Sequence, residues 1–184
     1  MVNTAGLQLE QAPPIHLPLR LLLTAPWFAV AAAVMLMVSG EQVVASRWTP
    51  TALAVVHLIT VGFLGQVMCG ALLQMLPVIA GAPVPRVHWV GAVVHVALSA
   101  GTALLVAGFL GGGPWLLGLG AGFAALGFAV FLAAAAPSLT RAQGAPATVG
   151  ALRMAAFSLA PTVIIGTVLA SVLIGWASLP GFPS

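Results

Sequence analysis

The chain has 184 residues, of which 61% are hydrophobic and only 4% are charged, and its mean hydropathy is +1.18. A soluble globular domain carries about 25% charged residues, so this composition excludes a chain that faces water on all sides. Long apolar stretches recur along the whole sequence, and a lipid bilayer is the solvent that suits them. The sequence therefore predicts an all-α integral membrane protein with a single transmembrane domain over residues 1–184.

The charged residues are few and scattered. Five arginines stand against Glu10 and Glu41, which gives a net charge of +3 and a pI near 11.4. Because the arginines form no cluster or basic stripe, we expect no nucleic-acid partner. The apolar segments hold no carboxylate pair, no Ser/His/Asp set with an identifiable acid and no phosphate-binding loop, so we expect no independent catalysis.

Five segments are long enough to cross a hydrocarbon core, which needs about 20 residues. We expect transmembrane helices at about residues 19–39, 51–76, 87–110, 114–136 and 148–176. The second helix is expected to stop at Pro77, because proline lacks a backbone donor and clashes with the preceding turn. Pro161 lies inside the fifth helix and predicts a kink there.

The connectors are expected at residues 40–50, 77–86, 111–114 and 137–146, the third of them a tight glycine hairpin. Because all are short, consecutive helices should be antiparallel neighbours. Arginines are enriched in cytoplasmic loops. An N-terminus on the inside places four arginines on the cytoplasmic side and only Arg47 outside; the four are Arg20, Arg86, Arg141 and Arg153. We therefore expect the N-terminus inside and the C-terminus outside.

The fourth expected helix is rich in small residues, including Gly118, Gly120, Gly122 and Gly127. Small residues let helix backbones approach closely in a membrane. The pattern predicts either close packing within the bundle or an interface between subunits.

Histidines supply most of the ionisable groups that the spans would have to bury. Ionisable residues within spans are costly and tend to be functional. His57 lies about two turns into the second helix from the outer side, and His95 lies about two turns into the third helix from the inner side. His88 precedes His95 by one heptad and shares its face, which Ser99 extends. His16 lies before the first span, where we expect no functional role.

Two histidines on adjacent antiparallel helices suggest a shared ligand. A b-type haem takes axial imidazoles from opposite sides of its ring, and a helical bundle holds such a ring between facing helices. No CxxCH motif supports a c-type haem. The spacing therefore predicts a haem b held by His57 and His95, with His88 in reserve. Measured from the outer surface, the expected depths are about 9 Å for His57 and roughly 20 Å for His95. This difference requires one of four explanations: a tilted ring, shifted helix ends, ligands from two subunits, or separate sites for the histidines.

Other interpretations of these residues stay open. A single histidine within a membrane can instead bond a helix carbonyl, and His88 can have an ordinary interfacial place. Met68, Cys69 and Met75 offer soft ligands that suit Cu(I). Methionine is also a common gap-filler in protein cores, so the copper interpretation competes with simple packing.

The stretch HLITVGFLGQVMCGALLQMLPVIAG at residues 57–81 resembles a haem-ligand helix of the haem–copper oxidase subunit I superfamily. It is most similar to small, divergent bacterial members related to nitric-oxide-response membrane proteins. The preceding LPLRLLLTAPWFAVAAAVML and SRWTPTALAVVH extend the resemblance over about the first three helices. The resemblance implies a multi-pass protein of the bacterial inner membrane in which His57 is an axial ligand of low-spin haem b.

In that superfamily the second axial ligand comes from a much later helix, for which this chain has no equivalent. The chain also lacks an HPEVY-like copper helix and an HxH pair, so we expect no dioxygen reduction at a binuclear centre. His95 is the substitute ligand by spacing alone. The superfamily is built from three four-helix units, and a chain of this size resembles one unit with an extra helix. A homo-oligomer is then a natural expectation.

The first functional hypothesis is therefore a small membrane cytochrome b that transfers electrons or binds a small gas. The second is a cofactor-free accessory or assembly subunit of a larger membrane complex, such as a respiratory one. Copper handling comes third.

Overall fold

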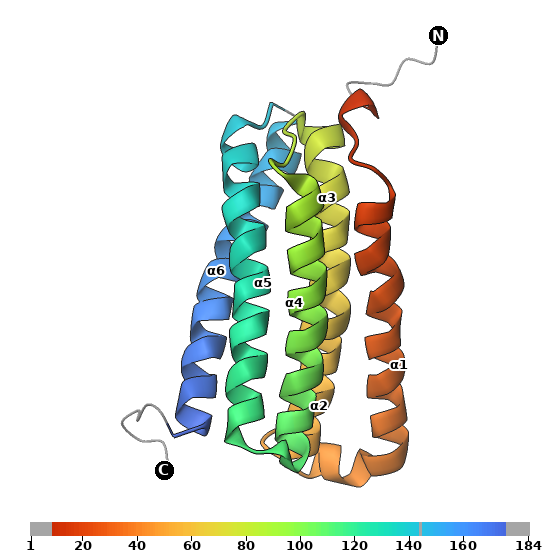
Figure 1. The fold of residues 1–184 in the computed structure, drawn as a ribbon, viewed down its shortest axis with the longest axis vertical. Helices are drawn as coiled ribbons and strands as arrows, with labels where there is room; N and C mark the ends of the chain where they lie inside the picture. Colours follow the sequence, from red (N-terminus) through yellow and green to blue (C-terminus); the bar gives the residue numbers. More distant parts are fainter. Residues whose placement is uncertain (1–8, 144, 176–184) are drawn as a thin grey trace.

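The computed structural model describes residues 9–143 and 145–175, which contain helices and no strand. They form five helical rods, each long and apolar enough to cross a membrane (Figure 1). After η1 (Leu9–Gln11), the first rod is α1 (His16–Ala45). The second rod comprises α2 (Pro50–His57), η2 (Leu58–Gly65) and α3 (Gln66–Ala80), and the third comprises α4 (Val87–Ala107) and η3 (Gly108–Gly112). The fourth rod is α5 (Pro114–Arg141) and the fifth is α6 (Pro146–Leu173). The predicted all-α fold with five membrane-length helices is confirmed.

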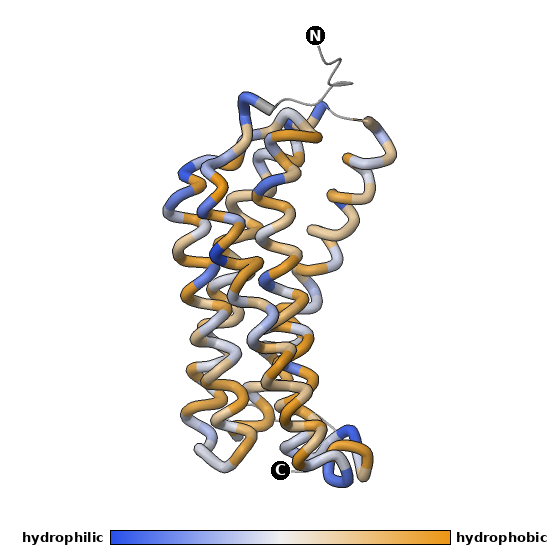
Figure 2. The backbone as a smooth tube through the Cα atoms, turned by 90° about the vertical axis from the view of Figure 1, so that its right-hand side faces the viewer, coloured by the Kyte–Doolittle hydropathy of each residue, from blue (hydrophilic) through white to orange (hydrophobic). Residues whose placement is uncertain are grey.

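Consecutive rods run in opposite directions and lie side by side (Figure 1). α1 packs against the second rod, α4 against α5, and α6 against α5. The expected antiparallel neighbours are thus present. Hydrophilic residues gather mostly towards the two ends of the rods, with a few along their length (Figure 2). This distribution is that of a multi-pass membrane protein.

Two prolines that were expected to end helices lie inside them. The second rod continues through Pro77 to Ala80, and α5 continues through Pro137 to Arg141, so both predicted ends are wrong. Lipid cannot satisfy exposed backbone groups, and neighbouring helices let membrane helices tolerate proline. The second rod ends instead at Gly81, whose left-handed φ of 60° lets its N–H bond the Leu76 carbonyl.

The first connector is also shorter than expected. α1 continues past Ser39, where the backbone departs from helical angles (φ −129°, ψ 27°), and ends at Ala45. The next rod begins at Pro50, where the Thr49 side chain accepts a hydrogen bond from the Ala52 N–H. α6 begins at Pro146, and residue 176, the expected end of the fifth helix, lies outside the described residues.

The hairpin predicted at residues 111–114 is confirmed. Gly111 and Gly113 have φ angles of 105° and 90°, which only glycine adopts without strain. This turn brings α5 back along α4 at close range. Methyl groups built on Gly101 and Gly120 would lie 2.7 Å and 2.5 Å from backbone nitrogens of the facing helix. The glycines of α5 at 120 and 127 therefore serve packing within the chain.

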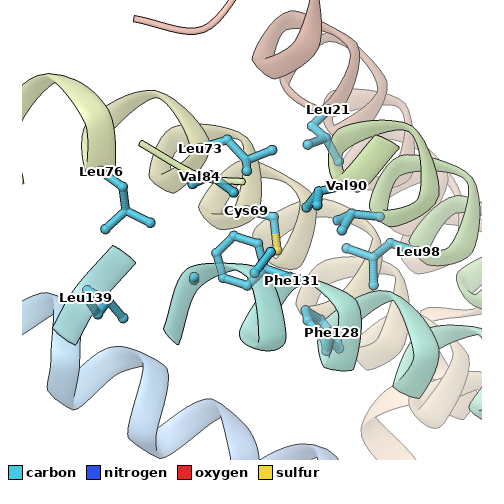
Figure 3. Packing of buried hydrophobic residues seen from close by; sticks show 13 residues of the cluster. Leu21, Cys69, Leu73, Leu76, Val84, Val90, Leu98, Phe128, Phe131 and Leu139 are labelled. Atoms are coloured by element: carbon cyan, nitrogen blue, oxygen red, sulfur yellow. The ribbon is translucent and has the colours of Figure 1, made fainter. Parts of the chain in front are cut away.

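The main core lies between α1, α3, α4 and α5 (Figure 3). Leu21, Cys69, Leu98 and Phe131 meet there, one from each of these helices, and Phe131 is only 1% exposed. α6 contributes partly buried side chains, and Val149 is its one buried residue. The fifth rod is thus the most loosely covered part of the described bundle.

The arginines divide between the two ends of the bundle as expected. Four of them lie at one end, near the starts of α1, α4 and α6 and at the end of α5, whereas Arg47 lies at the opposite end. Arg153 donates from Nε and Nη2 to the Leu139 carbonyl, at 3.0 and 2.9 Å, and so ties α6 to α5. Which end faces the cytoplasm remains the prediction made from the arginines.

Candidate functional site

His57 occupies the last position of α2, directly before the wider π turns of η2. Its ring is half-buried, and Nδ1 lies 2.7 Å from the Leu53 carbonyl oxygen. A carbonyl only accepts, so Nδ1 carries the proton and Nε2 keeps its lone pair. The ring also lies 5.1 Å from the Phe109 ring of η3, centroid to centroid. A histidine that carries its proton on Nδ1 can bind a metal through Nε2.

His57 lines a cavity with a volume of about 850 Å³. Its walls come from the second rod, from α4 and η3, from α5 and from α6, and Phe109 of η3 lies next to the His57 ring. Apart from His57, Thr60, Thr162 and Thr167, the lining is mostly apolar. One part of the wall is built from small residues, which are Gly65, Ala121, Ala124, Ala125, Ala155 and Ala156. Cofactor pockets are typically roughly 300–1,000 Å³, mostly apolar and supplied with few polar groups.

The wall of this cavity is tightly packed at Gly65. A methyl group built on this glycine would lie 3.0 Å from the Phe128 ring. Met68 also lines the cavity and is 52% exposed. A histidine with a free ring nitrogen thus lies in the wall of a mostly apolar cavity.

His95 lies elsewhere. Its Nε2 is 2.9 Å from Oγ1 of Thr24 on α1, so its ring faces the first rod rather than the cavity. At about 1.5 Å per residue, the helix between His95 and Phe109 is roughly 21 Å long, and Phe109 marks the level of His57. The structure does not bring His57 and His95 together, and axial ligands of one iron must meet it from its two sides.

A second polar site surrounds His95. Gln66 is completely buried on α3, and neither atom of its amide has a hydrogen-bond partner among the described residues. It stands one turn from both Gly62 and Gly70, whose built methyl groups would meet Phe28 and Leu21 of α1. The stripe therefore faces α1 at the level of Thr24. Ser99 lies one turn beyond His95, and its buried hydroxyl has no hydrogen-bond partner among the residues that the structure describes.

We expect Gln66→Leu to raise the melting temperature of the purified protein. A buried amide without partners has lost its hydrogen bonds to water and gained none within the protein, at a cost of about 1–3 kcal/mol. Leucine has a similar volume and no polar group to desolvate. Thermal unfolding in detergent measures the change, and Leu73→Ala, a truncation at a neighbouring buried position on α3, should lower it. A lower melting temperature for Gln66→Leu would mean that an internal water or ligand satisfies the amide.

The two remaining histidines lie next to each other. The rings of His16 and His88 are 5.8 Å apart, centroid to centroid, at the starts of α1 and α4. Both are exposed, at the end of the bundle that carries most of the arginines. His88 is thus far from the cavity, and it shares no cluster with His57. No sequence pattern indicated that His16 lies beside His88, because the pairing depends on how α1 and α4 pack.

The copper ligands suggested by the sequence are divided. Met68 and Cys69 line the cavity, but Cys69 is buried among core side chains (Figure 3) and Met75 is not among the lining residues. Residues 9–143 and 145–175 contain no group of three or more His, Cys, Asp or Glu side chains placed to hold a metal.

Comparison with protein-family models, curated proteins and solved structures finds no match for this chain. The resemblance to the haem–copper oxidase superfamily therefore rests on the stretch at residues 57–81 and its neighbours, and it stays a prediction.

Proposed function

We propose that this protein is a small membrane haem protein that holds one b-type haem through His57 and binds a small gas. The observation that carries the proposal is the pairing of a free His57 Nε2 with an apolar cavity of about 850 Å³. Bound haem would supply an iron atom able to take a diatomic gas. His57 would hold the group, and the Leu53 carbonyl would fix the orientation of the imidazole.

Gas binding is preferred over electron transfer because of what lines the cavity. His57 is the single imidazole among the described lining residues. Met68 belongs to the same rod as His57, and so it cannot approach from the opposite side of a ring. A haem held by His57 alone would keep a coordination position for a gas, whereas haems that transfer electrons usually have two protein ligands.

An absorption spectrum of the detergent-purified protein, oxidised and reduced, tests the proposal. We expect a Soret band, about one iron per chain, and a shift of the band when carbon monoxide is added to the reduced sample. A sample expressed with ample haem that shows neither Soret band nor iron would rule the proposal out.

The second candidate is a cofactor-free accessory subunit of a larger membrane complex. The observation that favours it is that Val149 is the one buried residue of α6, so most of this helix is available to pack against a helix of a partner. Co-purification with a membrane complex, together with an empty spectrum, would select this function.

A further inference from the structure

Basic side chains converge between the starts of α1 and α4. Arg86, His88 and Trp89 line a second cavity, of about 350 Å³, and the His16 ring lies next to His88. All four residues are exposed. Arg20, one turn into α1, adds a further positive charge on the same side. The two glutamates lie outside the cavity lining, Glu10 in η1 and Glu41 near the far end of α1.

The backbone holds Arg86 in an unusual conformation. Its φ of 50° is the one positive value among the described residues other than glycine. A left-handed backbone costs an ordinary residue about 1–2 kcal/mol, and such strain concentrates at ligand clamps. Glycine would be free of this strain, yet the position carries an arginine that lines the cavity.

We propose that this cavity binds the phosphate of an anionic phospholipid headgroup. A guanidinium binds phosphate oxygens through two parallel charge-assisted hydrogen bonds, and imidazole N–H groups add further donors. Trp89 is 59% exposed, and exposed tryptophans prefer the depth of the headgroups in a bilayer. Basic pockets between membrane helices bind anionic lipid headgroups by the same chemistry. The proposal does not depend on haem binding at His57.

A divalent cation is the other ligand that two neighbouring imidazoles suggest. The charges around the cavity oppose it, because Arg86 lines the cavity and the starts of α1 and α4 are the positive ends of their helix dipoles. The same charges attract a phosphate.

The test uses the full chain in a neutral detergent, titrated with phosphatidylglycerol or phosphatidylcholine, with bound lipid counted by native mass spectrometry. We expect retention of phosphatidylglycerol over phosphatidylcholine. Arg86→Gly should weaken this retention by at least about tenfold, the equivalent of one charge-assisted bond pair. Because glycine relieves the strain at position 86, unfolding cannot explain the loss. Arg141→Ala, which removes an exposed arginine from the same end, should leave retention unchanged.

Four results would overturn the proposal. Equal retention of the two lipids would mean that the protein has no preference for an anionic headgroup. An equal effect of Arg86→Gly and Arg141→Ala would mean that the lipid is held by the overall positive charge of this end and not by the cavity. Displacement of the lipid by inorganic phosphate at similar concentration would assign the cavity to free phosphate. Binding of Zn²⁺ that is lost in His16→Ala would assign it to a metal.

Discussion

His57→Gly should abolish the Soret band of the purified protein, and free imidazole in the medium should restore it. The variant removes the one imidazole of the lined cavity and leaves a space in which a free imidazole can take its place. We expect the haem content to fall by at least about tenfold, since no other described lining residue offers a nitrogen ligand. Absorption spectra with and without imidazole measure both effects.

The rescue separates loss of the ligand from loss of the fold, because an unfolded protein would not recover haem when imidazole is added. His95→Gln is the matched control: its site faces Thr24, so the Soret band should stay. If His95→Gln removed haem and His57→Gly did not, the cavity lined by His57 would not be the haem site.

Gly120→Ala should lower the free energy of unfolding by about 1–3 kcal/mol, as overpacking of a tight contact does. The added methyl group would lie 2.5 Å from the backbone nitrogen of Leu105, and a backbone cannot move aside as a flexible side chain can. α4 and α5 would have to move apart along the contact where Gly101 and Gly120 lie against the facing backbone. Chemical unfolding in detergent or lipid measures the change.

Gly122→Ala provides the control within the same helix. Nothing lies within 4 Å of its built methyl group. Alanine is favoured over glycine in helices by roughly 0.5–1 kcal/mol, so this variant should be as stable as the parent or slightly more. Equal destabilisation by both variants would contradict the close α4–α5 contact and point to a general need for small residues.

The long apolar runs were sufficient to predict the number of rods and their order, because only membrane-length helices bury such runs. Helix ends were harder to predict. Pro77 and Pro137 carry the local signals of a helix end, yet their helices continue, since in a bilayer the rest of the bundle decides how far a helix extends. The Gly111–Gly113 turn was predictable because two left-handed glycines leave few alternatives.

The candidate site was predictable in its residue types but not in its geometry. The sequence predicted that His88, His95 and Ser99 share one face of the third helix, and the Ser99 hydroxyl is indeed buried. His95 on that face contacts Thr24 of α1 instead of the second rod, because the direction of a face depends on how helices are rotated against one another. The cavity wall joins Gly65 to Ala155 and Ala156, which are far apart in the chain. No local pattern indicates such a wall.

The loose attachment of α6 has a consequence for how the protein is made. Chains leave the ribosome from the N-terminus, and earlier segments fold first. α1 to α5 therefore insert before α6 does, and during that interval His57 and the α5 wall face lipid on the side that α6 later covers. A hydrophobic ligand delivered through the bilayer would reach the histidine most easily then. Cells short of that ligand during synthesis would accumulate protein that is slower to fill afterwards.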